Sequence, residues 1–94
     1  MYKDRKVSVV VPAYNEEELI GSTLSGIPDY VDHVYVVNDG SLDGTHRVIE
    51  EHDEKDPRIE AIHHEENHGV GAAIVSGYRK SLENGVDGRM GMAA

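Results

Sequence analysis

The chain has 94 residues, enough for one small domain, and we expect residues 1–94 to form a single one. Its formal net charge of −9 argues against a nucleic-acid partner, because such binding needs clustered lysine and arginine side chains to neutralise phosphates. The chain has no cysteine, which excludes disulfides and thiolate metal sites and makes the reducing cytoplasm the expected compartment.

The first predicted element is a strand over residues 6–11. Its apolar run, residues 7–11, is too short to cross a bilayer, and we expect no transmembrane segment. Asn15 is placed to cap the helix that follows. The apolar side chains that share one face of that helix are Ile20, Leu24 and Ile27. A second strand is predicted over residues 33–37 and ends at Asn38-Asp39-Gly40.

The second half of the chain predicts another helix, a strand and a third helix. Asp43 or Thr45 can cap the second helix, which Asp56-Pro57 breaks. Residues 59–63 alternate between apolar and polar side chains, which indicates a strand exposed on one side at the sheet edge. The third helix begins at about Gly69. Its apolar side chains recur at every fourth position, as on the apolar face of an amphipathic helix: Val70, Ile74, Tyr78 and Leu82.

These segments alternate as β-α-β-α-β-α, which is typical of a three-layer α/β/α fold with a mostly parallel sheet. Residues 86–94 are a weak candidate for a fourth strand, because they contain Gly88 and Gly91 and few β-branched residues. We expect this segment to be a disordered tail if it does not pair. In a doubly wound sheet it would lie beside the first strand, so its weakness leaves an edge open, and we expect a homo-oligomer through that edge.

The loop after the first strand carries side chains suited to a nucleotide. Pro12 rigidifies the chain as it leaves the sheet, and Tyr14 can stack on a planar base. Glu16 can accept hydrogen bonds from a ribose or a base. The same residues are also consistent with a purely structural strand-to-helix turn, so this loop alone does not decide between the two.

The loop after the second strand offers a more specific chemistry. Asp39 can accept the ring N–H of uracil or guanine, whereas adenine presents an acceptor at the matching nitrogen. Uridine or guanosine nucleotides are therefore favoured over adenosine. Gly40 permits a positive φ and a close approach of backbone, and Ser41 can hold the loop through a hydrogen bond to the main chain. An Asp-Gly-Ser turn alone is common and usually structural.

Taken together, residues 9–17 (Val-Val-Val-Pro-Ala-Tyr-Asn-Glu-Glu) and 36–45 (Val-Val-Asn-Asp-Gly-Ser-Leu-Asp-Gly-Thr) resemble family 2 glycosyltransferases with the GT-A fold. That group includes polyprenyl-phosphate sugar synthases. Residues 63–71 are similar to the family's Asn-x-Gly segment. The resemblance covers about residues 6–85 and implies a Rossmann-like, truncated GT-A domain. The residues that it implies in donor-nucleotide binding are Pro12, Ala13, Tyr14, Glu16, Asp39, Gly40, Ser41, Asn67 and Gly69.

The resemblance implies a glycosyltransferase fragment that binds a UDP- or GDP-linked sugar for transfer to a polyprenyl phosphate or a saccharide. Full-length relatives hold Mg²⁺ or Mn²⁺ at an Asp-x-Asp motif and carry a catalytic base in a later region. Neither is found in these 94 residues, so we expect no catalytic residue, no metal ligand and no sugar transfer by this chain alone. We interpret His63, His64 and His68 as part of a solvated loop rather than a metal site, because strand neighbours point to opposite faces.

Two other functions stay open. The chain could be a non-catalytic α/β binding or assembly module that oligomerises through an open sheet edge. It could also be a dinucleotide-dependent oxidoreductase, but Gly69-Val70-Gly71 follows the third strand and lacks the third glycine of that fingerprint. The oxidoreductase is therefore the least favoured of the three.

Overall fold

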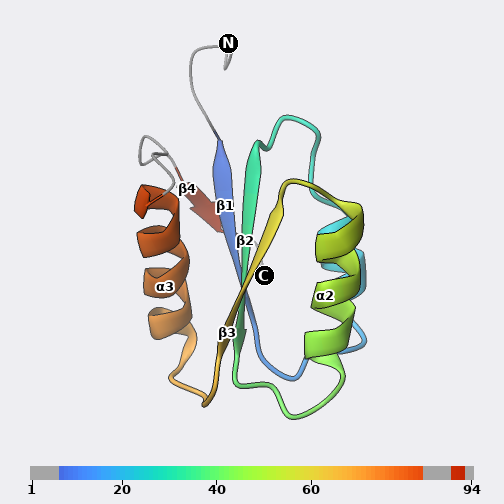
Figure 1. The fold of residues 1–94 in the computed structure, drawn as a ribbon, viewed down its shortest axis with the longest axis vertical. Coiled ribbons are helices and arrows are strands. Elements are labelled where there is room, and N and C mark those ends of the chain that lie inside the picture. The colour runs from blue at the N-terminus through green and yellow to red at the C-terminus, as the bar shows by residue number, and fades with distance from the viewer. Residues whose placement is uncertain (1–6, 84–89, 93–94) are drawn as a thin grey trace.

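A computed structural model describes residues 7–83 and the backbone of residues 90–92. The elements in chain order are β1 (Ser8–Ala13), α1 (Ile20–Ser25), β2 (His33–Asp39), α2 (Thr45–Lys55), β3 (Ile59–His64), α3 (Val70–Glu83) and β4 (Met90–Met92). The four strands pair in parallel in the order β3-β2-β1-β4 (Figure 1). This arrangement confirms the predicted α/β fold with a parallel sheet. Within the described residues, no helix is both long and apolar enough to cross a membrane.

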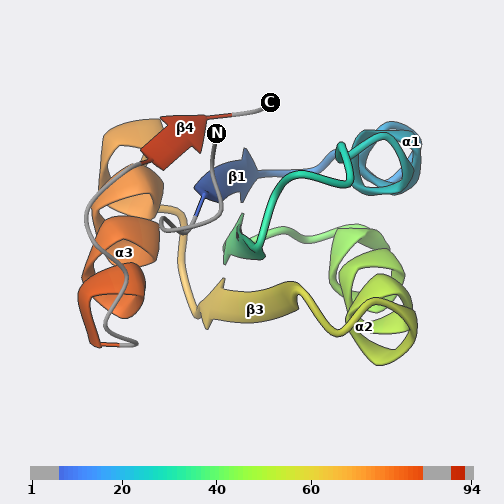
Figure 2. The same cartoon turned by 90° about the horizontal axis from the view of Figure 1, so that it is seen from above.

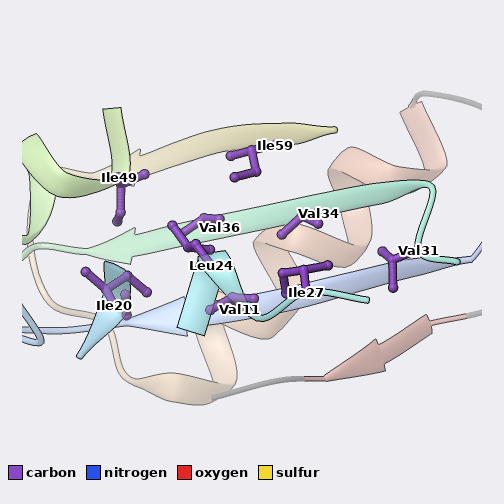
Figure 3. Packing of buried hydrophobic residues seen from close by; sticks show 10 residues of the cluster. Val11, Ile20, Leu24, Ile27, Val31, Val34, Val36, Ile49 and Ile59 are labelled. Atoms are coloured by element: carbon purple, nitrogen blue, oxygen red, sulfur yellow. The ribbon is translucent and has the colours of Figure 1, made fainter. Parts of the chain in front are cut away.

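Helices cover both faces of the sheet, with α1 and α2 on one side and α3 on the other (Figure 2). Alternate strand residues therefore enter two separate cores. Val11, Val34 and Val36 pack with α1 and α2 in the larger core (Figure 3). Val10 and Tyr35 pack towards α3 in the smaller one. Because both faces are buried, the two central strands are continuous apolar runs, as parallel strands usually are.

The weak fourth strand is present as β4, a three-residue strand. Its backbone pairs in parallel with β1, with Gly91 opposite Val9. The other residues of the expected tail, 86–89 and 93–94, lie outside the described part of the chain. Because β4 lies beside β1, it covers the edge whose exposure the sequence suggested at residues 8–10. The predicted homo-oligomer through an open edge stays a prediction.

The expected helix cap at Asn15 is wrong. Asn15 has a φ of +50°, and α1 begins five residues later with Leu19 at its N-cap position and no side-chain cap. The side chain of Asn15 instead accepts the backbone N–H of Leu42, 2.8 Å away in the next loop. This contact between loops replaces the local cap. In α2, Gly44 takes the N-cap position, while the Asp43 carboxylate accepts the N–H of Thr45 at 2.9 Å.

The apolar face expected for α3 is wrong for three of its four residues, while the fourth, Ile74, is half-buried. Val70, Tyr78 and Leu82 are 64%, 42% and 49% exposed. The residues of α3 that the structure buries are small: Ala73, Gly77 and Ser81. The reason is the close approach of α3 to the sheet, since a Cβ atom placed on Gly77 would lie 2.6 Å from a methyl carbon of Val10. Small side chains therefore face the sheet and the larger ones point outward.

Candidate functional site

A cleft of about 300 Å³ opens where β1 and β2 end and α3 begins. Its volume is at the lower end of the range for small-molecule sites. Its lining residues are Pro12, Ala13, Tyr14, Glu16, Asp39, Asn67, Val70 and Ala73. The structure thus brings six of the nine predicted site residues to one cleft, from three loops far apart in sequence. The other three, Gly40, Ser41 and Gly69, lie in the loops that shape it.

Asp39 is the most enclosed polar group of this cleft, with only 3% of its surface exposed. Its Oδ1 accepts hydrogen bonds from the His68 N–H at 3.0 Å and from His64 Nδ1 at 2.8 Å, and its Oδ2 accepts the Gly69 N–H at 2.8 Å. Burial raises the pKa of Asp39, but the hydrogen bonds from His64 and the two backbone amides outweigh it and hold the pKa below its ordinary value of 3.8. The carboxylate is therefore ionised at neutral pH.

Gly40 holds two loops in contact, the second loop (residues 40–44, after β2) and the third loop (residues 65–69, after β3). Its φ of +74° is in the left-handed region, and a Cβ atom here would lie 2.5 Å from the backbone nitrogen of Asn67. The Asn67 amide in turn donates to the carbonyl oxygen of Asp39 at 3.3 Å. Gly69 also has a positive φ, of +97°, but nothing lies within 4 Å of a Cβ atom there. Of these two glycines, only Gly40 is therefore required for close packing, and this packing places Asn67 beside Asp39.

Hydrogen bonds also join the first loop (residues 14–19, after β1) to the second loop. The backbone N–H of Asn15 donates to Ser41 Oγ at 3.0 Å, and the N–H of Glu16 donates to Thr45 Oγ1 at 2.8 Å. The hydroxyl of Ser41 is thus engaged in holding the loops together. These contacts fix the backbone around Tyr14, whose side chain is 44% exposed at the rim of the cleft.

The sequence interpretation missed His64 and Ser76. The predicted solvated histidine loop is wrong for His64, whose side chain is only 15% exposed and whose Nε2 lies 2.7 Å from Ser76 Oγ on α3. The alternation of side chains along β3 could have indicated that His64 is enclosed, because His64 shares a face with Ile62, which packs in the core under α3. Without the register of β2 and β3, that face could not be connected to Asp39.

A second histidine cluster lies on the α2 side of the sheet. The donor atoms of His46, Glu50 and His63 lie within 4.8 Å of one another. The amide oxygen of Asn38 accepts the Ser41 N–H, so its amide nitrogen donates to His63 Nδ1 at 3.1 Å. A neutral His63 then carries its proton on Nε2, 2.7 Å from Glu50, and cannot offer that nitrogen to a metal ion. The rings of His46 and His63 are also stacked, which points their nitrogen lone pairs side by side instead of at one ion.

Residues 8–84 match the family model described as Glycosyl transferase family 2. The chain belongs to glycosyltransferase family 2. Among curated family members, it is 32% identical to the UDP-N-acetylglucosamine–dolichyl-phosphate N-acetylglucosaminyltransferase of Methanococcus voltae, covering 89% of this chain and 39% of that protein. It is 36% identical to the undecaprenyl-phosphate mannosyltransferase of Micrococcus luteus, covering 87% of this chain and 35% of that protein.

Solved glycosyltransferase structures share the fold. The mannosyltransferase PcManGT from Pyrobaculum calidifontis, in complex with GDP-Man and Mn²⁺, superposes with a TM-score of 0.73 at 32% identity, covering 80% of this chain and 24% of that one. S. aureus TarS 1–349 in complex with UDP gives a TM-score of 0.66 at 25% identity, covering 94% and 26%. The fold is therefore that of GT-A glycosyltransferases, and the chain spans less than half the length of these relatives.

Proposed function

We propose that this chain is the donor-binding part of a glycosyltransferase that uses a UDP- or GDP-linked sugar for transfer to a polyprenyl phosphate or a saccharide. The observation that carries the proposal is the cleft itself, in which a buried, ionised Asp39 lies with Tyr14 and Glu16 from another loop. The names of the relatives, which include UDP- and GDP-sugar enzymes, support it. The proposed compartment is the cytoplasm, because a chain without cysteine needs no disulfides and fits a reducing environment.

Each lining group has a role in this proposal. The Asp39 carboxylate accepts the ring N–H of uracil or guanine, because an ionised carboxylate is an acceptor only. The Tyr14 ring stacks on the base, and Glu16 accepts hydrogen bonds from ribose hydroxyl groups. The diphosphate lies towards the start of α3, where Val70 and Gly71 present backbone N–H groups at the positive end of the helix dipole. Adenosine diphosphate fits less well, since adenine offers no ring N–H at the matching position.

The proposal does not extend to sugar transfer by these 94 residues. Among the described residues, the carboxylates that line the cleft are Asp39 and Glu16, and Asp39 already accepts three hydrogen bonds. A Mg²⁺ or Mn²⁺ ion needs several free oxygen ligands, so these residues do not form its site. The sequence also contains no Asp-x-Asp motif. We therefore expect nucleotide binding with no transfer activity.

Isothermal titration calorimetry with UDP, GDP and ADP, each with and without Mn²⁺, tests the proposal. The informative variant is Asp39→Ala, and the matched control is Asp53→Ala, which removes an aspartate from α2, away from the cleft. We expect UDP or GDP binding that is lost in Asp39→Ala and kept in Asp53→Ala. If neither UDP nor GDP binds to the wild-type chain at millimolar concentration, the proposed function is wrong.

One observation favours a second candidate, a non-catalytic module that assembles through its surface. The outward side of α3 exposes Val75, Tyr78 and Leu82, each between 42% and 49% exposed, and such clustered apolar side chains often mark an interface. The net charge of −9 opposes association of two copies. Sedimentation over a wide concentration range distinguishes the two functions, since a monomer at every concentration would exclude self-assembly.

A further inference from the structure

The two oxygens of Asp39 are not equally available to a ligand. Each carboxylate oxygen can accept about two hydrogen bonds. Among the described residues, Oδ1 accepts two, from His64 Nδ1 and the His68 N–H, whereas Oδ2 accepts one, from the Gly69 N–H. Oδ1 is therefore fully engaged within the protein, and the one acceptor position that remains is on Oδ2.

His64 is held in one orientation by groups on both sides. Because the ionised Asp39 only accepts, Nδ1 of His64 donates to it, while Nε2 on the other side of the ring lies 2.7 Å from the hydroxyl oxygen of Ser76. The Asp39 and His64 side chains are 4% and 15% exposed, so water competes little for these bonds. The pair thus fixes which oxygen of Asp39 is occupied before any ligand arrives.

The same order of groups, Asp39, His64 and Ser76, occurs in the triads of serine hydrolases. Here Ser76 lies in the interior of α3, where backbone N–H groups bond within the helix. The backbone N–H groups of its helix neighbours are therefore engaged and cannot stabilise an oxyanion, as acyl transfer requires. The arrangement therefore acts on Asp39 and does not make Ser76 a nucleophile.

We propose that His64 makes this site selective for uracil over guanine. Uracil presents a single ring N–H between two carbonyl groups, and one free acceptor on Asp39 is sufficient for it. Guanine presents two adjacent donors, the ring N–H and the exocyclic amine, which a carboxylate satisfies only with both oxygens. With Oδ1 engaged by His64, one guanine donor stays unpaired in the cleft, at a cost in affinity. This inference rests on the proposed function and names the donor as a uridine diphosphate sugar.

Paired titrations of the wild-type chain with UDP and GDP, under identical Mn²⁺ and salt conditions, test the inference. We expect UDP to bind at least about tenfold more tightly, the effect of one unpaired donor beside a charged acceptor. In His64→Leu the Oδ1 position is freed, and the ratio of the two affinities should fall towards one. In His64→Asn the amide can still donate to Asp39, and the wild-type ratio should be retained.

The ratio of the UDP and GDP affinities separates base selectivity from protein stability. If His64 had only a structural role, its loss would weaken the binding of both nucleotides to the same extent. His63→Leu is the matched control, since it makes the same substitution at the neighbouring residue on the opposite face of β3, away from the cleft, and it should keep the UDP preference. Equal or tighter binding of GDP to the wild-type chain overturns the inference and leaves the proposed function intact. An unchanged ratio in a folded His64→Leu variant overturns it as well. If neither nucleotide binds to the wild-type chain, the proposed function and this inference both fail.

Discussion

Replacing Gly77 by alanine tests how closely α3 packs on the sheet. A Cβ atom at this position would lie 2.6 Å and 2.8 Å from the two methyl carbons of Val10, and 3.3 Å from its Cβ. Valine is β-branched and stiff, so no rotation of Val10 removes both methyl groups from the contact. Gly77→Ala must therefore push α3 away from β1. This displacement occurs next to the part of α3 that lines the cleft.

The expected loss of stability follows from two opposing terms. Overpacking of this kind costs about 1–3 kcal/mol, while alanine improves the helix propensity by about 1 kcal/mol over glycine. The net loss should therefore reach up to about 2 kcal/mol. Gly71 lies on the same helix with nothing within 4 Å of its Cβ position. Gly71→Ala should thus gain up to about 1 kcal/mol, since only the propensity changes.

Urea denaturation followed by far-ultraviolet circular dichroism measures both variants, and the lack of tryptophan makes this signal preferable to fluorescence. The chemical change is identical in the two variants, so their opposite signs isolate the contact with Val10. A Gly77→Ala variant stabilised as much as Gly71→Ala, or a Gly71→Ala variant destabilised as much as Gly77→Ala, would refute the close packing of α3.

Three further predictions follow from the same structure. Gly40→Ala should lower both the free energy of unfolding and the affinity for UDP, because a Cβ atom there displaces the third loop. Gly69→Ala should lower only the free energy of unfolding, by about 1–2 kcal/mol of backbone strain. Titration with UDP and urea denaturation measure both variants, and equal effects would show that the loop contact is unimportant. Ser8→Ala should raise the free energy of unfolding by about 1 kcal/mol, because the buried Ser8 hydroxyl has no partner among the described residues, and a loss in urea denaturation would contradict this. In the folded state the pKa values of Asp39 and Asp56 lie below the ordinary value of 3.8. The stability that the two carboxylates contribute is therefore present above that pH and is lost as the pH falls below it. Urea denaturation at stepped pH should show this decline, and a constant free energy of unfolding down to pH 2 would exclude it.

Much of the fold could be predicted because it depends on local pattern. The β-branched runs, the alternation in β3 and the turn residues give the order of elements and the edge position of β3. The loops at the ends of β1 and β2 meet because parallel strands end at one edge of the sheet. The face of α3 could not be predicted in the same way. Periodicity counts large apolar side chains, whereas the close approach of α3 to Val10 selects small ones.

The helix cap at Asn15 failed for a related reason. A cap is a local hydrogen bond, and sequence reasoning assumes that it forms unless something better is available. Here the second loop offers the Leu42 N–H at 2.8 Å and the Ser41 hydroxyl at 3.0 Å, both more than 25 residues away. Such contacts depend on the placement of β1 beside β2, which no local pattern contains.

The part of the site that depends most on tertiary structure is the pairing of Asp39 with His64. The two residues are register partners of β2 and β3, and the preceding pair, Asn38 and His63, points to the opposite face. A slip of one residue would place His63 opposite Asp39 and leave His64 without its acceptor. The same slip would also turn Ile59, which is 5% exposed, out of the core beneath α1 and α2. The burial of an apolar residue at the start of β3 thus determines which histidine contacts the carboxylate at its end, and through it which nucleobase the cleft is expected to accept.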